Sequence, residues 1–349
     1  MTSGMRIAPL RGTDIPELSQ FLIGGFGVPA TSQHFSHEAL KWKYFDGQSE
    51  PSADSACSLV ARTAGKIVGH IGLCHRQLIV PGDGAPPVPT LHAIDWLGSA
   101  AHPGSGTLLM LQAIAASKTQ FAIGGSDQVQ DLFPRLGFER KPGLAIFRKV
   151  LNPSHRLRRR DEGFFRKWVG TVKNVVSARF ERTPPVLEAV ELRSVPAFPV
   201  EIDHLQRQAP LRIVTCERGH VLLNSLLRCP IPGLSGWTIH ASQRMIGYAV
   251  LKMTPNSRIP FGTIVDCWLD TADPSFWQAA VAALNDRLRA FSAYYVTAYA
   301  VNPMLHAALL LNGFAKRGET NVYVRDKQQL LPKGHLFGLS RFDADGVFH

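Results

Sequence analysis

Apolar and polar positions change their period several times along the chain, which predicts alternating strands and helices. Residues 58–63 and 66–80 are apolar runs around an Ala-Gly turn and predict two paired strands. Residues 90–117 carry an apolar run, a Gly/Pro/Ser turn and a second, longer apolar run, which predicts a strand that leads directly into a helix. Residues 120–124 then predict a strand, and residues 126–136 predict a helix closed by Gly-Phe.

The second half of the chain repeats this order. Strand, helix, strand and helix are predicted at residues 262–270, 275–291, 294–301 and 303–311, and the last helix ends in Asn-Gly-Phe. Each copy carries one aspartate within its first apolar strand, Asp95 in the first half and Asp266 in the second. The repeated order predicts a tandem duplication of one α/β unit.

Length and composition favour two folded domains. A chain of 349 residues is too long for one comfortable core, and 45% hydrophobic with 19% charged residues is typical of a globular protein. We divide it into domains at 1–151 and 200–349, with a connector at 152–199. No apolar run reaches the roughly 20 residues of a membrane span. The first residues lack a signal-peptide apolar region, so a cytoplasmic protein is expected.

Cysteine spacing and charge narrow the classes further. The five cysteines include no CxxC pair, so we expect reduced, mostly buried thiols rather than a zinc site or disulfides. The net charge of +11 favours anionic partners. Nucleic acid is the least favoured of these, because no recognisable reading module accompanies the basic residues.

More than half of the net charge lies at residues 152–182, which hold nine Lys/Arg against three Asp/Glu. Aromatic and aliphatic residues, Phe164 and Trp168 among them, fall on one face of a helix there. Such a segment fits peripheral contact with the inner face of an anionic membrane, where each basic residue contributes about 1 kcal/mol to binding. It also fits a helix packed between the two halves, and we favour this interdomain packing.

The turn within residues 90–117 carries the first candidate chemistry. Small residues between a strand and a helix leave backbone N–H groups at the helix start unpaired, which makes an anion site. The turn residues, Gly104, Ser105, Gly106, Thr107 and Leu108, therefore predict a phosphate cradle for a nucleotide-like cofactor. Asp95 lies one strand-length away, and burial is expected to raise its pKa and suit it to acid/base work. The alternative is a structural carboxylate that caps a turn or pairs with a neighbouring Arg.

This order of elements resembles the GNAT (Gcn5-related N-acetyltransferase) superfamily. Three motifs carry the resemblance: Trp42-Lys43-Tyr44, the Gly104-Ser105-Gly106 turn nine residues after Asp95, and Leu136-Gly137-Phe138. The likeness is closest to bacterial GNAT-like proteins of exopolysaccharide and surface-glycan loci. It implies an α/β fold with a mixed sheet and two tandem GNAT-like domains. In such folds the central strand receives the pantetheine arm and the turn holds the coenzyme A pyrophosphate.

The chain departs from the family pattern at several positions. Pro103 stands where the family's turn begins with Gln or Arg, and Leu108 stands at its last small position. Phe133 replaces a tyrosine that often serves as general acid. The loop after Asp266 contains no glycine, so we assign any coenzyme site to the first half. The second half is then a degenerate copy that shapes the acceptor side.

We therefore predict a GNAT-type N-acyltransferase. It would transfer an acyl group, most simply acetyl from acetyl-CoA, to an amino group of a sugar nucleotide or exopolysaccharide precursor, without a metal. Asp95 is the predicted catalytic residue. The predicted coenzyme-binding residues are Leu97, Gly98, Gly104, Ser105, Gly106, Thr107 and Leu108. The predicted acceptor-binding residues are His37, Trp42, Tyr44 and Asp266, with His34 considered beside them.

Two alternatives stay open. The first is a non-catalytic GNAT-fold protein that binds a glycan or a partner in surface polysaccharide biosynthesis. The second is a FemABX-like aminoacyl transferase, also a tandem GNAT fold, which uses charged tRNA. The sequence does not identify the acceptor, the acyl chain length or the oligomeric state, nor whether acyl carrier protein replaces coenzyme A.

Overall fold

The computed structural model describes residues 4–46, 57–80, 85–153, 190–205, 213–254, 260–334 and 336–343. Its strands are β1 (Arg6–Pro9), β2 (Ser58–Thr63), β3 (Lys66–Ile79), β4 (Val88–Gly98), β5 (Thr119–Ile123), β6 (Glu139–Val150), β7 (Val190–Val195), β8 (Ile213–Cys216), β9 (Leu234–Ala241), β10 (Arg244–Thr254), β11 (Phe261–Leu269), β12 (Tyr295–Ala300), β13 (Ala315–Asp326) and β14 (Leu336–Phe337). Its α-helices are α1 (Ile15–Phe26), α2 (His37–Lys41), α3 (Ser105–Ala116), α4 (Asp127–Arg135), α6 (Ile202–Leu205), α7 (His220–Leu227), α8 (Pro274–Ala290) and α9 (Pro303–Leu311).

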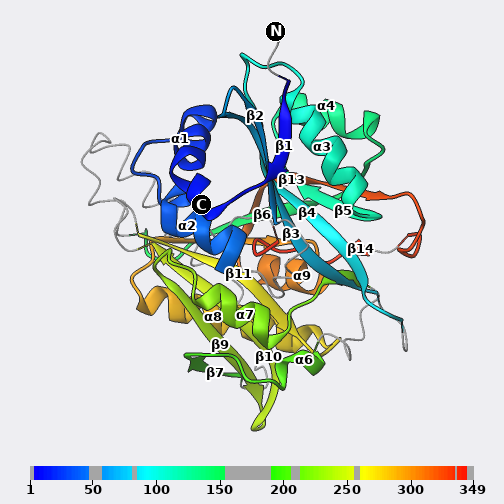
Figure 1. Ribbon diagram of the computed structural model, residues 1–349. Coiled ribbons are helices and arrows are strands. Elements are labelled where there is room, and N and C mark those ends of the chain that lie inside the picture. Colours follow the sequence, from blue (N-terminus) through cyan, green and yellow to red (C-terminus); the bar gives the residue numbers. More distant parts are fainter. Residues whose placement is uncertain are drawn as a thin grey trace.

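One mixed sheet runs through the described chain, with helices on both of its faces (Figure 1). Its strand order is β1-β2-β3-β4-β5-β13-β6-β12-β11-β10-β9-β7. The series β4, α3, β5 and α4 of the first half recurs as β11, α8, β12 and α9 in the second. The predicted α/β fold with a mixed sheet and a tandem duplication is therefore confirmed.

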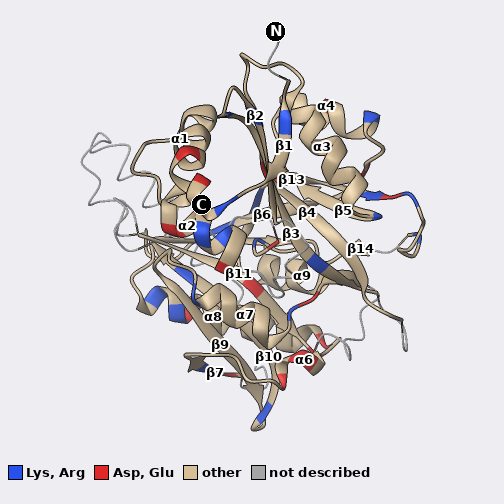
Figure 2. Cartoon of the chain, in the orientation of Figure 1, with Lys and Arg blue, Asp and Glu red and all other residues tan. Residues whose placement is uncertain are grey.

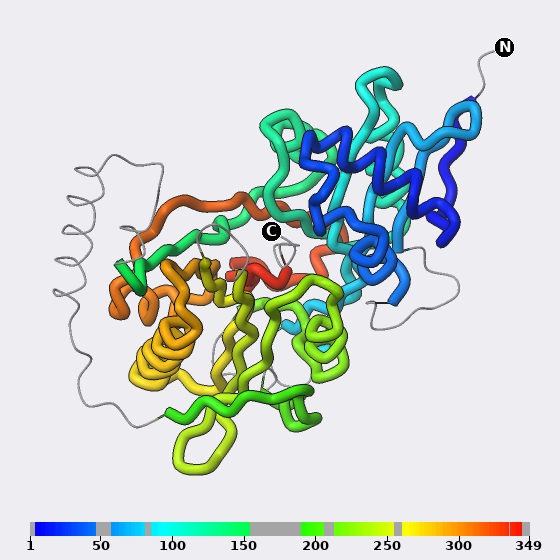
Figure 3. The backbone as a smooth tube through the Cα atoms, turned by 90° about the vertical axis from the view of Figure 1, so that its left-hand side faces the viewer, coloured from blue at the N-terminus to red at the C-terminus, as the bar shows by residue number. Residues whose placement is uncertain are grey.

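The two halves exchange strands at the centre of this sheet. β13, from the end of the chain, lies between β5 and β6 and pairs antiparallel with both. β6, from the first half, pairs on its other side with β12 of the second half. Figure 3 shows the halves as two lobes, with β6 in green and β13 in orange-red side by side between them. Each half of the sheet thus contains a strand that the other half supplies.

The last part of the predicted connector at 152–199 contains a strand. β7 lies inside that range and pairs with β9, so it is the edge strand of the second half of the sheet. Most of the basic segment 152–182 lies outside the described residues, so its predicted membrane contact and its predicted interdomain packing both stay predictions. None of the described helices is long and apolar enough to cross a membrane.

Alternating side chains of β2 and β3 divide the core of the first half into two layers. Val60 and Ile67 pack with α1 and α2, whereas Ala61 and Val68 pack with α3 and α4. The period of two along a strand produces this division, because successive side chains point to opposite faces. Helices α1 and α2 therefore cover one face of the first half's sheet and α3 and α4 the other, as Figure 1 shows.

Residues 32–46 form three short pieces. A 3-10 turn, η2 (Gln33–Phe35), precedes α2, and a π-helical turn, η3 (Trp42–Asp46), follows it. The Trp42 indole N–H donates to the carbonyl of Ser225 in α7, at 3.2 Å. This segment of the first half therefore packs against a helix of the second.

All five cysteines lie in the described ranges and none of them forms a disulfide there; four are buried, as the sequence predicted.

Candidate functional site

A bulge in β4 shapes the candidate site. The pairing of β4 with β3 shifts register between His70 and Gly72, and Asp95 adopts a left-handed backbone with φ of +47°. Such a conformation is uncommon for a residue other than glycine, and it turns the strand. In the described chain, β4 pairs with β5 only at Leu91 and His92. Beyond His92 the two neighbouring strands separate and leave a gap in the sheet.

A cavity of about 790 Å³ occupies this gap. Its lining comes from the separated ends of β4 and β5, the start of α3, α4, the end of α1 and η2. These elements lie on both faces of the sheet, so the cavity extends through the gap from the α3/α4 face to the α1/η2 face. No lysine or arginine stands among the described residues that line it.

Asp95 lies in the cavity wall at the centre of a buried polar cluster. Its Oδ2 accepts hydrogen bonds from the Tyr44 hydroxyl at 2.6 Å and from the Lys43 ammonium at 3.0 Å. Its Oδ1 is 3.6 Å from Nε2 of His34, and that Nε2 is 3.4 Å from the Lys43 Nζ. The side chains of Lys43 and Asp95 are only 2% and 5% exposed. Asp95 and His34 line the cavity, whereas Lys43 and Tyr44 stand behind them.

The expected rise in the pKa of Asp95 is wrong. Burial does raise this pKa, but the Lys43 ammonium, the His34 imidazole and the Tyr44 hydroxyl outweigh burial and hold the pKa well below its usual value. Asp95 is therefore an ionised carboxylate in a buried ion pair, and its partner is a lysine rather than the arginine considered from the sequence. An ionised carboxylate of low pKa attracts a cation strongly but accepts a proton weakly.

His70, on the neighbouring strand β3, holds the bulge of β4 in place through a hydrogen bond. Its Nδ1 lies 2.9 Å from the Asp95 carbonyl oxygen and its Nε2 lies 2.7 Å from the Ser58 hydroxyl. Burial lowers the pKa of His70 to about 4. The ring is therefore neutral at pH 7, and because a carbonyl only accepts, Nδ1 donates to Asp95 and Nε2 accepts from Ser58.

The start of α3 provides the predicted anion site. Gly104 caps the helix with φ of +85°, and the amides of Gly106 and Thr107 find no protein acceptor among the described residues. The Ser105 hydroxyl is buried and also lacks a partner there. Figure 2 shows α3 without any charged residue, so the site consists of backbone amides and one hydroxyl. Such a helix start favours an anion.

The strand end and the helix start approach each other closely. A Cβ at Gly98 would lie 2.7 Å from the amide nitrogen of Gly106, so only glycine fits at position 98. The Trp96 indole N–H donates to the Gly106 carbonyl at 2.8 Å and further fixes the two elements.

Six of the seven predicted coenzyme-binding residues line the cavity: Leu97, Gly98, Gly104, Ser105, Gly106 and Thr107. Leu108 is the exception and does not line the cavity. Its side chain is 47% exposed and its amide already donates to the Gly104 carbonyl.

The predicted acceptor residues separate in the structure. Tyr44 reaches the site through its bond to Asp95, but His37 is exposed and does not line the cavity. Trp42 contacts α7 instead, and Asp266 belongs to a second cluster. Sequence analysis missed Lys43, although it stands in the Trp-Lys-Tyr motif, because nothing local pairs it with a carboxylate 52 positions away.

Phe133 lies in the cavity wall and brings no hydroxyl there. Its ring packs 6.0 Å from that of Trp96 and 4.6 Å from that of Tyr323 on β13. The strand supplied by the end of the chain thus supports the cavity wall of the first half.

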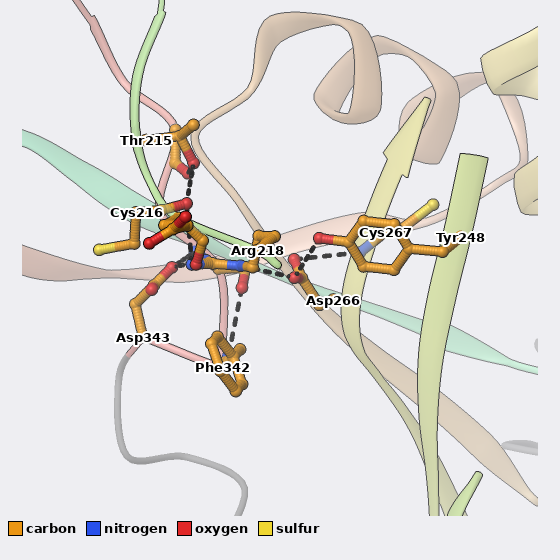
Figure 4. A network of polar contacts seen from close by, with 11 residues as sticks. Thr215, Cys216, Arg218, Tyr248, Asp266, Cys267, Phe342 and Asp343 are labelled. Atoms are coloured by element: carbon orange, nitrogen blue, oxygen red, sulfur yellow. Dashed lines mark hydrogen bonds and ion pairs between the residues drawn. The ribbon is translucent and has the colours of Figure 1, made fainter. Parts of the chain in front are cut away.

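The second cluster surrounds Arg218, which is buried (Figure 4). Its Nε donates to Asp266 at 2.8 Å, its Nη2 pairs with Asp343, and its guanidinium lies 4.6 Å from the Phe342 ring centre. The Tyr248 hydroxyl also donates to Asp266, at 3.0 Å. Asp266 thus repeats the pattern of Asp95, with a tyrosine and a basic partner.

The C-terminal residues close this second cluster. β11 and β12 pair through Ile264 and Ala298, and the next residues of both strands contact the end of the chain. The Phe342 amide donates to the Val265 carbonyl at 3.2 Å, and the Arg341 guanidinium lies 4.6 Å from the Tyr299 ring centre. Residues 341–343 therefore occupy the place that the cavity has in the first half. The predicted acceptor role of Asp266 finds no support here, because its carboxylate is enclosed and paired.

Comparisons with known proteins identify the fold. No protein-family model and no curated protein matches the chain. Solved structures do match, among them a GCN5-related N-acetyltransferase from Anabaena variabilis (TM-score 0.61, 12% identity, covering 92% of this chain and 72% of that one). N-myristoyltransferase from Saccharomyces cerevisiae with bound myristoyl-CoA also matches (TM-score 0.61, 11% identity, 93% and 83%). So does Eis1 from Mycobacterium abscessus (TM-score 0.53, 15% identity, 92% and 73%).

The chain therefore has the GNAT fold, arranged in tandem. At these identities the likeness establishes the fold, and no match supports the exopolysaccharide type that the sequence suggested.

Proposed function

We propose that the protein is an acyl-CoA-dependent N-acyltransferase that binds its acyl donor in the cavity of the first half. The observation that carries the proposal is that one cavity joins unpaired amides at a helix start to an ionised carboxylate across separated strands. The myristoyl-CoA bound to the yeast enzyme of the same fold supports a thioester donor.

In this proposal the phosphates of the donor bind the Gly106 and Thr107 amides, and its thioester arm enters the gap between β4 and β5. The amine of the acceptor attacks the thioester carbonyl carbon, the strand end at Leu97 and Gly98 polarises that carbonyl, and coenzyme A leaves as the thiolate. Because Phe133 has no hydroxyl, the thiolate takes its proton from water.

Asp95 attracts and orients the ammonium form of the acceptor, because its carboxylate stays ionised. The ammonium loses one proton to water before it attacks, and the second proton, lost as the amide forms, passes to water or to the His34 imidazole, whose Nε2 lies 3.6 Å from Asp95. Asp95 is thus assigned an orienting role in place of the general base predicted from the sequence.

The test is thermal unfolding with and without saturating acetyl-CoA. A ligand at about 100 times its dissociation constant stabilises by roughly 2.7 kcal/mol, or about 5–10 °C. Gly106→Trp should abolish the shift, because the new ring fills the helix start beside Trp96. Gly12→Trp is the matched control, since a side chain at Gly12 meets nothing within 4 Å and lies outside the cavity.

Calorimetric titration should give one acetyl-CoA per chain, because the end of the chain fills the corresponding place in the second half. A shift that survives Gly106→Trp would contradict the assigned site. No binding by either method would favour the non-catalytic alternative.

A further inference from the structure

The cavity wall on the α1/η2 side is almost wholly apolar. Gly25, Phe26, Val28, His34 and Phe35 form it. His34 is the one polar side chain among these five residues, and its Nε2 already faces Asp95 and Lys43. The surface that this wall offers to an acceptor is therefore hydrocarbon and aromatic.

An aromatic pair stands within this wall. The rings of Phe26 and Phe35 stack at 5.3 Å between centres, with 15° between their planes. Phe35 is buried, but Phe26 is 43% exposed. An exposed ring next to a cavity offers a stacking surface to an apolar or aromatic ligand.

Charge at the inner end of the wall favours a cation. Asp95 is the one carboxylate among the described lining residues, and it is ionised. Lys43 pairs with Asp95 from behind the wall and offsets part of its charge, but no described lysine or arginine lines the cavity itself. A ligand that suits both features has an ammonium at one end and an apolar body beside the phenylalanines.

An amino sugar suits this wall poorly. Each hydroxyl that leaves water needs a hydrogen-bond partner, and a hydroxyl without one costs binding free energy. The wall has no polar side chain to give beyond His34, which the Asp95 cluster already engages.

We propose that the acceptor is a primary amine on an apolar body of about the size of an aromatic ring, such as an arylalkylamine, rather than an amino sugar. This inference rests on the proposed acyl transfer and specifies its acceptor. It replaces the sugar nucleotide or glycan precursor predicted from the sequence.

The test compares phenethylamine with glucosamine as acceptors, with acetyl-CoA as donor and release of the coenzyme A thiol as readout. We expect kcat/KM to favour phenethylamine by about a hundredfold, the discrimination that an apolar wall reaches against a ligand with added hydroxyls. Direct binding of acetyl-CoA is measured in parallel, so that donor binding and acceptor choice are separate readouts.

Two variants probe the wall. Phe26→Ala should raise KM for phenethylamine by about three- to tenfold, which matches the contribution of one aromatic contact, and leave KM for acetyl-CoA unchanged. Val28→Thr keeps the side-chain shape, adds a hydroxyl to the wall and should raise the same KM. Phe291→Ala is the matched control, because Phe291 is 44% exposed on the second half and lies outside the cavity.

Each other outcome is decisive. Equal or better use of glucosamine overturns the inference and leaves acyl transfer intact. So does a Phe26→Ala variant that changes KM for octanoyl-CoA but not for phenethylamine, because the wall would then hold an acyl chain. If acetyl-CoA binds and no amine is acetylated, the proposed transfer itself fails, and the inference fails with it.

Discussion

Asp95 and Asp266 lie on corresponding strands. Each carboxylate accepts a hydrogen bond from a tyrosine hydroxyl and forms an ion pair with a basic side chain. They differ in what lies beyond the cluster. Asp95 faces a cavity, whereas Asp266 faces the end of the chain through Arg218. The same buried ion pair is thus accessible in one half and enclosed in the other.

Asp95→Asn should destabilise the protein by about 3–5 kcal/mol, because the substitution removes the buried carboxylate that pairs with the Lys43 ammonium. It should also raise KM for the amine acceptor at least about tenfold, since the amide no longer attracts an ammonium. Denaturant unfolding measures the loss of stability. Steady-state kinetics, at a temperature below the melting temperatures of wild type and variant, measure the change in KM.

Asp266→Asn is the control for this prediction. It removes the equivalent ion pair of the second half and should lower stability without changing KM for the amine. If both variants change KM alike, Asp95 has only a structural role.

His70 gives a pH dependence with a defined sign. Its folded pKa of about 4 lies below the usual value of roughly 6.5, so the unfolded chain binds more protons between these two values. The contribution of neutral His70 to the free energy of unfolding is fully present above about pH 6.5. As the pH falls toward 4, this contribution is lost, by on the order of 3 kcal/mol.

His70→Gln should therefore flatten the loss of stability between about pH 6.5 and 4, measured by urea unfolding across that range. A slope remains, because burial also lowers the pKa of His92, to about 3. At pH 8, His70 is neutral in both the folded and the unfolded protein, so the difference in unfolding free energy between wild type and variant there gives the pH-independent cost of the substitution. Parallel curves for the two proteins would contradict the prediction.

At the scale of elements, the site depends on how closely α1 packs against β4. A Cβ at Gly25 would lie 2.2 Å from the Cδ2 of Leu97, whereas a Cβ at the neighbouring Gly24 meets nothing within 4 Å. Leu97 also lines the cavity. The end of α1 therefore sets the position of a side chain two residues beyond Asp95.

Gly25→Ala should move the Leu97 side chain and lower kcat/KM for the amine by roughly tenfold, since small shifts in a packed site are costly. Gly24→Ala should leave kcat/KM unchanged and stabilise the protein by up to about 1 kcal/mol, because alanine favours the helix. Adding Leu97→Ala to Gly25→Ala restores space and should recover kcat/KM for the amine. Equal kinetics for the two alanine variants would contradict the prediction.

Prediction of elements from the sequence succeeded where the pattern is local and strong. The series from β4 to α4 and from β11 to α9 follows from apolar runs and glycine turns. β13 was not predicted, because its first residues, Ala315 to Glu319, are mostly polar and exposed and burial begins only further along the strand. Within residues 32–46, a π-helical turn directs Lys43 and Tyr44 toward Asp95, and no local pattern of the sequence indicates such a turn.

At the scale of the whole molecule, the strand exchange makes the halves interdependent. β13 lies between β5 and β6 of the first half and is the strand that joins them in the sheet. Without β13, both strands would expose unpaired backbone groups along an edge, and Tyr323 would no longer pack against Phe133.

A fragment of residues 1–153 should therefore not fold alone, whereas coexpression with residues 190–349 should yield a soluble complex. Circular dichroism melting of the fragment and co-purification through a tag on one piece measure this. The complex should also recover the acetyl-CoA shift. A cooperative melting transition in residues 1–153 alone would show that β13 is dispensable.

The sequence by itself determined the repeated order of strands and helices, the α3 turn and the position of Asp95 at its strand. These features follow from the local hydrophobic period and from the backbone preferences of glycine and proline, and both can be read from residues that are close together in the chain. Only the tertiary structure decided the strand exchange, the ionisation of Asp95 and the closure of the second cluster. Each of these joins groups far apart in the chain, and the pattern around a residue indicates whether it is buried but not which partner it meets there.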